Sequence, residues 1–212
     1  MNLMARKLAH LLAENSNGSF FEDEIRYGLE IALGALWQII IIALTALLLG
    51  IAKEVLSVAL SAAVYRRYSG GPHCQTFYRC TFTSLVTFVG LGYISRNIPF
   101  SYLSFYIAFI AAFTVLIIHS RVPVDNPINP ISDKQIIRKR KQKSYFMVFL
   151  VLLASIYTGY ISEGKLVSIA LLLGLLWQNF TLLPWGRSYI YLWDRLFDKV
   201  EKLFHGKEVT EC

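Results

Sequence analysis

The densest group of residues able to do chemistry lies between Arg66 and Thr81, in the stretch RRYSGGPHCQTFYRCT. It contains one histidine, His73, and two cysteines, Cys74 and Cys80. A thiolate attacks carbonyl carbons well, and a nearby base helps it to form at neutral pH. One functional interpretation of the stretch is therefore a nucleophile, Cys80, with His73 as its base.

The spacing of His73 and Cys80 sets a condition on such a dyad. Along one continuous helix seven residues rise about 10.5 Å, and helical side chains lean toward the N-terminus, so His73 would point away from Cys80. Gly70-Gly71-Pro72 predicts a turn or irregular backbone. We therefore expect a helix break between Gly70 and about Gln75, with His73 folded back over a helix that carries Cys80.

Other roles remain open on the residues alone. Cys80 could be a small buried residue and His73 an interfacial polar one, or Cys74 could be the nucleophile. His73, Cys74 and Cys80 are also three potential zinc ligands, with His119 as a remote candidate. Their spacing is not that of a standard zinc site, so we expect no metal and no other cofactor.

The elements that must position these residues are membrane helices. Of 212 residues 55% are hydrophobic and 17% are charged, against about 25% charged in a typical soluble domain. The apolar runs are continuous, which excludes a transmembrane β-barrel, and the composition excludes a soluble enzyme or a secreted domain. A sixth stretch, Val55–Tyr65, is shorter and is a weaker candidate for a spanning helix. Five longer stretches without Asp, Glu, Lys or Arg approach the length of a spanning helix: Ile31–Ala52, Thr81–Ser95, Asn97–Ser120, Tyr145–Ser162 and Leu166–Gly186.

The predicted fold is an all-α polytopic membrane bundle of about six transmembrane segments in a single domain, residues 1–212. Residues 1–30 form a cytoplasmic interfacial segment, residues 31–186 the bundle, and residues 187–212 an interfacial helix. The two ends are assigned to the interface because their apolar and basic residues fall on opposite helix faces; packing against the bundle is the alternative. The distribution of Lys and Arg places the motif in the cytoplasm. A net charge of +7 fits anionic lipid better than nucleic acid, because the basic residues flank membrane segments.

A run of basic residues directly precedes the fourth long apolar stretch. We expect it to anchor the topology and to bind anionic lipid, and its charges could also attract an acidic peptide. Its members are Arg138, Lys139, Arg140, Lys141 and Lys143. Two further groups could support the motif: Gln75 as an oxyanion donor, and Asp125 or Asn126 by orienting His73, although turn formation is an alternative for the latter pair.

Two parts of the sequence resemble one known family. The residues from Arg66 to His73, followed by Cys80-Thr81, closely resemble the signature of the accessory gene regulator B family. The segment PVDNPINPI at residues 123–131, followed by basic residues and an apolar stretch, is similar to that family's central loop. Length and order of segments agree as well, so the resemblance covers nearly the whole chain.

The resemblance implies a multi-pass cysteine endopeptidase of the bacterial cell membrane, acting at the cytoplasmic face on the precursor of a cyclic quorum-sensing peptide. The catalytic residues that it implies are His73 and Cys80, while Cys74 does not occupy the nucleophile position. The implied partner is a small precursor with an amphipathic N-terminal part, a central cysteine or serine, and an acidic C-terminal tail. A homodimer is left open.

The implied chemistry conserves the energy of the cleaved bond. Cys80 would attack the carbonyl before the tail and retain the peptide as a thioester, which a cysteine within the peptide could exchange for a thiolactone. A small transporter without covalent chemistry, or a scaffold, is the alternative. Against a transporter, no inverted repeat is visible in the sequence.

Overall fold

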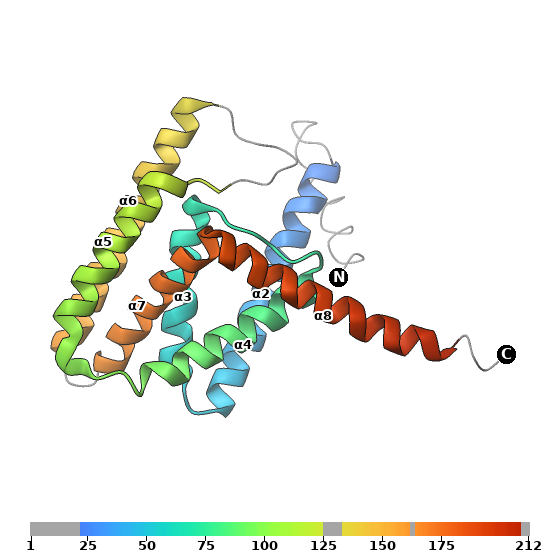
Figure 1. Ribbon diagram of the computed structural model, residues 1–212, viewed down its shortest axis with the longest axis horizontal. Helices are drawn as coiled ribbons and strands as arrows, with labels where there is room; N and C mark the ends of the chain where they lie inside the picture. Colours follow the sequence, from blue (N-terminus) through green and yellow to red (C-terminus); the bar gives the residue numbers. More distant parts are fainter. Residues whose placement is uncertain (1–21, 125–132, 162–163, 209–212) are drawn as a thin grey trace. The chain divides into compact units, whose positions relative to one another are not determined.

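The computed structural model describes residues 22–124, 133–161 and 164–208, and these are folded as α-helices joined by short connections (Figure 1). A single turn of 3₁₀-helix, η1 (Phe100–Tyr102), precedes α5. The α-helices of the described ranges are α2 (Glu22–Leu48), α3 (Ala52–Ser69), α4 (Phe77–Ser95), α5 (Leu103–Arg121), α6 (Lys134–Tyr160), α7 (Lys165–Leu182) and α8 (Pro184–Glu208). The all-α fold class is therefore confirmed.

The chain divides into two units, residues 1–45 and residues 46–212. The described part of the first unit is helix α2, in which Arg26 pairs with Asp23 at 3.1 Å. The predicted N-terminal interfacial segment lies mainly outside the described residues. All the functional candidates of the motif belong to the second unit.

Four helices of the described ranges are long and apolar enough to cross a membrane: Gly28–Leu48, Phe100–Arg121, Lys134–Tyr160 and Lys165–Leu182. They correspond to four of the five long apolar stretches and identify a helical membrane protein. The remaining long stretch, Thr81–Ser95, forms most of α4, and the weaker stretch, Val55–Tyr65, lies within α3. The prediction of about six transmembrane segments was therefore approximate. Helices α3 and α4 are present, but they are not apolar enough to be candidate spans.

The least apolar of these segments is surrounded by other helices. Helix α3 packs against α4, α6 and α7, and its side chains Val55, Val58 and Tyr65 are fully buried. Since neighbouring helices cover it, α3 needs no long apolar surface for lipid. This explains why its sequence signal is weak although it extends over 18 residues.

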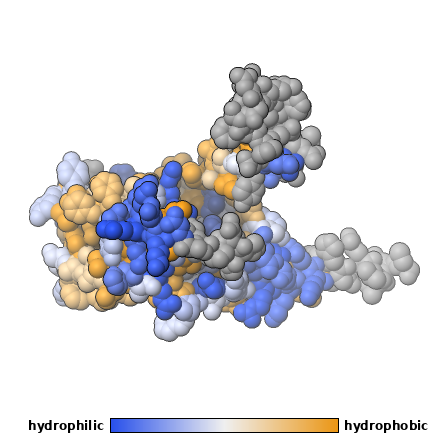
Figure 2. Space-filling view, turned by 90° about the horizontal axis from the view of Figure 1, so that it is seen from above, coloured by the Kyte–Doolittle hydropathy of each residue, from blue (hydrophilic) through white to orange (hydrophobic). Residues whose placement is uncertain are grey.

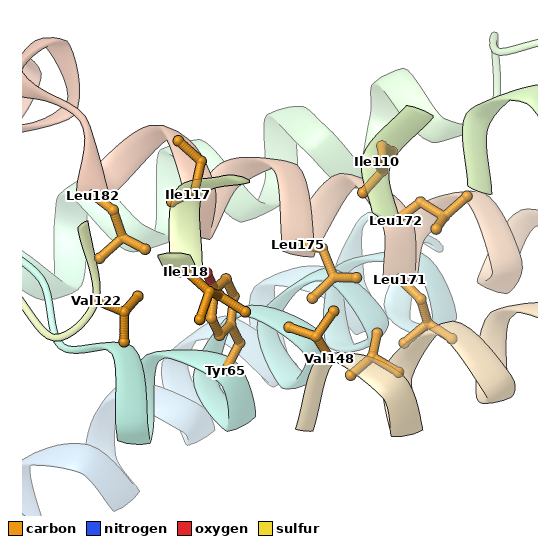
Figure 3. Packing of buried hydrophobic residues seen from close by; sticks show 11 residues of the cluster. Tyr65, Ile110, Ile117, Ile118, Val122, Val148, Leu171, Leu172, Leu175 and Leu182 are labelled. Atoms are coloured by element: carbon orange, nitrogen blue, oxygen red, sulfur yellow. The ribbon is translucent and has the colours of Figure 1, made fainter. Parts of the chain in front are cut away.

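A buried cluster of aliphatic side chains joins α3, α5, α6 and α7 (Figure 3). Tyr65 of α3 belongs to this cluster and lies beside Ile118 in Figure 3. Its hydroxyl donates to Asn179 Oδ1 at 3.2 Å, and Asn179 Nδ2 donates to Thr114 Oγ1 at 2.6 Å. All three polar groups are fully buried, so the chain of hydrogen bonds satisfies them inside the bundle.

Small residues allow α3 and α7 to approach closely. Gly174 of α7 faces α3, and a Cβ atom there would lie 2.7 Å from Ser61 Oγ and would also collide with the Val58 carbonyl oxygen. The Ser61 hydroxyl donates to the Leu171 carbonyl at 2.7 Å across the same interface. This is the small-residue packing typical of helices in membranes.

We predict that Gly174→Ala separates α3 from α7 and lowers the free energy of unfolding by about 1–3 kcal/mol, the usual cost of overpacking. Thermal unfolding in detergent measures the effect. Gly90→Ala on α4 is the matched control, because no atom lies within 4 Å of a Cβ placed there. Equal losses for the two variants would contradict the close α3–α7 contact.

Candidate functional site

The predicted helix break is present. Helix α3 ends at Ser69, α4 begins at Phe77, and the intervening residues 70–76 are not helical (Figure 1). The prediction of a break between Gly70 and about Gln75 is therefore confirmed. Cys80 lies in the first turn of α4, where its N–H donates to the Thr76 carbonyl at 3.1 Å.

Glycine is required where the chain leaves α3. Gly70 has φ +74° and ψ −157°, a conformation that residues with a Cβ atom rarely adopt. A Cβ atom there would also overlap the carbonyl oxygen of Val124. Gly70 and Val124 pair as an isolated β-bridge, in which the Val124 N–H donates to the Ser69 carbonyl at 2.9 Å. The segment after α5 therefore lies directly against the start of the break.

Two side chains from the flanking helices hold the beginning of the break. Gln178 of α7 is buried, and its Nε2 donates to Ser69 Oγ at 3.0 Å and to the Gly70 carbonyl at 2.8 Å. The Arg66 guanidinium of α3 donates to the Pro72 carbonyl. These bonds satisfy carbonyl groups that the interrupted helix leaves without helical partners.

The break brings His73 and Cys80 together. His73 lies close enough to Cys80 to lower the pKa of its thiol, although seven residues separate the two along the chain. His73 is exposed and Cys80 is half-buried. Both residues lie outside the four candidate spans, at the end of the bundle where α3 stops and α4 starts.

The surroundings of Cys80 favour its thiolate. A hydrogen bond from Cys74 is the largest cause that lowers the pKa of Cys80, and the hydrogen bond and positive charge of His73 and the charge of Arg66 act in the same direction. Burial opposes them. The first turn of α4 adds the positive end of a helix dipole, which also favours an anion.

Cys74 has the opposite character. Its hydrogen bond to Cys80, then burial, raise the pKa of the Cys74 thiol. Its Sγ lies 3.9 Å from Thr83 Oγ1, one turn beyond Cys80 on α4. The raised pKa keeps Cys74 a neutral thiol, so Cys80 is the better nucleophile of the two sulfurs.

The predicted supporting residues have different outcomes. The Gln75 residue is exposed, and its main-chain N–H donates to Asp194 of α8 at 3.2 Å to Oδ1 and 3.3 Å to Oδ2. Its role as an oxyanion donor stays a prediction. Asp125 and Asn126 lie outside the described residues.

Sequence reasoning did not single out Arg66 or Asp194. The role of Arg66 could have been predicted from the sequence, because an arginine in the last turn of a helix can donate to the carbonyl groups at the helix end. Asp194 is separated from Gln75 by 119 residues, so only the packing of α8 on α4 reveals their contact.

The basic run belongs to a helix that starts earlier than the apolar stretch. Helix α6 begins at Lys134, capped by the Asp133 carboxylate, which accepts from the Gln135 N–H at 2.7 Å. The run therefore forms the first turns of α6, at the hydrophilic end of the second unit seen in Figure 2. Because successive residues of a helix face different directions, the five basic side chains are distributed around α6.

Three of the five basic residues line one open depression of about 310 Å³: Lys139, Arg140 and Lys143, together with Arg67, Tyr68 and Ile136. The Lys143 ammonium lies 5.4 Å from the centre of the Tyr68 ring. Lys141 instead donates to the His119 carbonyl at 2.8 Å, and Arg138 is exposed. The depression adjoins the C-terminal end of α3, from which the break starts.

Comparisons with known proteins identify one family. A model of the family described as accessory gene regulator B matches residues 4–182. A putative AgrB-like protein of Clostridium perfringens is 26% identical over 213 residues, covering 93% of this chain and all of the relative. The accessory gene regulator protein B of Staphylococcus intermedius is 27% identical over 185 residues, covering 84% of this chain and 91% of the relative.

Protein FsrB of Enterococcus faecalis is a further relative, 25% identical over 167 residues, which cover 78% of this chain and 66% of that protein. No solved structure matches the chain. The family match includes the whole motif with the break, His73 and Cys80, together with the basic start of α6. The chain therefore belongs to the accessory gene regulator B family.

Proposed function

We propose that this protein is a membrane cysteine endopeptidase that removes the C-terminal tail from the precursor of a quorum-sensing peptide. In this proposal Cys80 is the nucleophile and His73 its general base. The observation that carries it is the helix break at residues 70–76, which places His73 beside the Cys80 thiol and lowers the pKa of that thiol. Family membership supports the same assignment at the level of accessory gene regulation.

The reaction starts with proton transfer from the Cys80 thiol to His73. The Cys80 sulfur then attacks the carbonyl carbon that precedes the tail. When the tetrahedral intermediate collapses, the carbon–nitrogen bond breaks and His73 returns the proton to the leaving amine. The tail departs with a free amino group, and the rest of the peptide remains on Cys80 as a thioester.

Ring closure needs no further source of energy. A cysteine thiol within the bound peptide gives its proton to His73 and attacks the thioester carbonyl, a thiolactone forms, and Cys80 is released as a thiolate. Exchange of one thioester for another is nearly balanced in free energy; a serine in the peptide would give a lactone instead. Water competes with this step, so the half-buried position of Cys80 supports cyclisation over hydrolysis.

The basic depression beside the break is a suitable place for the acidic tail. We place the active site at the cytoplasmic face, where the positive-inside rule puts clusters of arginine and lysine. A tail bound against Lys139, Arg140 and Lys143 would leave its N-terminal end near the end of α3. Anionic lipids are competing partners for the same charges.

The catalytic assignment predicts that Cys80→Ser and His73→Ala each reduce tail removal by at least about 10²-fold, the usual contribution of a positioned base. Cys74→Ser should retain substantial activity, because Cys74 is not the proposed nucleophile and serine can still donate a hydrogen bond to Thr83. The assay incubates membranes containing each variant with a candidate precursor that has an acidic C-terminal tail, and mass spectrometry identifies the products.

Two results would contradict the assignment. An inactive Cys74→Ser variant beside an active Cys80→Ser variant would mean that the wrong sulfur has been assigned. If the wild-type protein leaves the precursor intact, the endopeptidase proposal fails, and a transporter or scaffold is favoured. The amount of each variant in the membrane is measured alongside, to separate catalysis from insertion.

For the basic depression we predict that replacing Lys139, Arg140 and Lys143 together by glutamine raises the apparent KM with little change in turnover. Exposed ion pairs contribute about 0.2–1 kcal/mol each, so three contacts correspond to a rise of about three- to a hundredfold. Added salt should weaken wild-type binding in the same way. Assays in detergent remove any effect of membrane orientation.

The matched control replaces Arg138, Lys199 and Lys202 by glutamine, which removes the same charge from positions that do not line the depression. Its apparent KM should stay close to that of the wild type. Equal KM values for both triple variants, or no response to salt, would show that the depression does not recruit the tail.

A further inference from the structure

Helix α8 crosses the start of α4 and reaches the functional site from the far end of the chain (Figure 1). It begins at Pro184, directly after the non-helical residue Leu183 that ends α7. Its residues lie beyond the segment matched by the family model, which ends at residue 182. Any role of α8 in the site is therefore an addition to the motif discussed so far.

Aromatic side chains fix the position of α8 on α4. The Phe82 ring of α4 lies edge-on to Trp193 at 5.6 Å and to Phe197 at 5.5 Å between ring centres. Tyr78 makes a third such contact with Phe197 at 6.0 Å. Part of the apolar face that suggested an interfacial helix therefore packs against the bundle, while Leu192 and other apolar residues of α8 stay exposed.

A buried arginine completes the contact between the two helices. Arg79 of α4 is 3% exposed, and three carboxylates of α8 surround its guanidinium. Its Nη1 lies 2.7 Å from Asp198 and 3.7 Å from Asp194 Oδ1, and its Nη2 lies 2.9 Å from Glu201. Nη1 also donates to the Asp194 carbonyl at 3.2 Å. Arg79 thus orients the face of α8 that carries the three acids.

Asp194 differs from the other two acids in its second partner. It is 2% exposed, and both of its carboxylate oxygens accept from the main-chain N–H of Gln75. Gln75 lies two residues after His73, within the break. Asp198 and Glu201 also contact Arg79, and among the described residues Asp198 has no hydrogen bond to the break.

We propose that Asp194 is a positioning residue of the site: its carboxylate holds the Gln75 N–H and thereby keeps His73 over Cys80. The inference rests on the proposed function of the dyad. Its physical basis is that a break of seven residues between two helices has few internal hydrogen bonds, so an external acceptor restricts where His73 can lie. A charged acceptor makes this bond stronger than a neutral one.

The test compares Asp194→Ala with Asp198→Ala, because each variant removes one carboxylate from Arg79 and only the first frees Gln75. Asp194→Ala should lower turnover on the order of 10- to 100-fold at an unchanged KM, the effect of a misplaced catalytic group. Asp198→Ala should stay within about twofold of wild type. Asp194→Asn, which keeps an acceptor oxygen, should recover most of the turnover.

A second readout needs no peptide. The alkylation rate of Cys80 by iodoacetamide at pH 7, measured by peptide mapping, should fall on the order of tenfold in Asp194→Ala and not in Asp198→Ala. This readout separates the two proposals: if no precursor is cleaved by the wild type, the proposed function fails, while the alkylation rates still test the role of Asp194.

Asp194→Ala removes one of the carboxylates that balance the buried charge of Arg79, which also affects folding. The double variant Arg79→Met with Asp194→Leu removes the two buried charges together, and replacing a buried ion pair by apolar residues of similar volume is often neutral or stabilising. It should insert normally and show the same slow alkylation of Cys80. Equal slowing by Asp194→Ala and Asp198→Ala, or wild-type alkylation in Asp194→Ala and the double variant, would overturn the proposal.

Discussion

The site depends on one constraint: a helix can be interrupted inside a bundle only if its freed backbone groups find other partners. The break between α3 and α4 meets this requirement with groups from four different places. The Val124 N–H binds the Ser69 carbonyl, Gln178 binds the Gly70 carbonyl, Arg66 binds the Pro72 carbonyl, and Asp194 accepts from Gln75. Each bond also fixes a neighbouring helix relative to the break. The same contacts that make the irregular segment possible therefore determine where His73 lies.

This arrangement explains why α3, which is not apolar enough to be a candidate span, packs against three other helices of the second unit. Helix α3 must carry Arg66 to the break and must also admit α7, which supplies Gln178, at close range. Burial of Tyr65 and the contact of Gly174 with Ser61 serve the second need. As a member of the accessory gene regulator B family, the protein takes part in accessory gene regulation, and its apolar helices place it in a membrane.

Much of this could be predicted from the sequence because the relevant signals are local. Apolar stretches indicated the membrane helices, and Gly70-Gly71-Pro72 together with the seven-residue spacing indicated the break. The basic run was identified from the sequence, but the start of its helix at Lys134 was not. A search for apolar stretches does not detect a helix end made of charged residues. The contact of Asp194 with Gln75 depends on the packing of α8 across α4. No pattern within either segment predicts this contact. The apolar stripe of α8 was visible in the sequence, but it fits a helix at the membrane surface as well as one packed against the bundle.

The central claim is that the break activates Cys80 through His73. It is tested most directly by the pH dependence of alkylation at each cysteine, resolved by peptide mapping of the intact membrane protein in detergent. Because the pKa of Cys80 is lowered, its thiolate should persist as the pH falls below about 8.5, the ordinary value for a cysteine, and its rate should decline only in the acidic range. In His73→Ala the midpoint should move upward. A wild-type midpoint near 8.5 that His73→Ala leaves unchanged, or faster alkylation of Cys74 than of Cys80, would contradict the account.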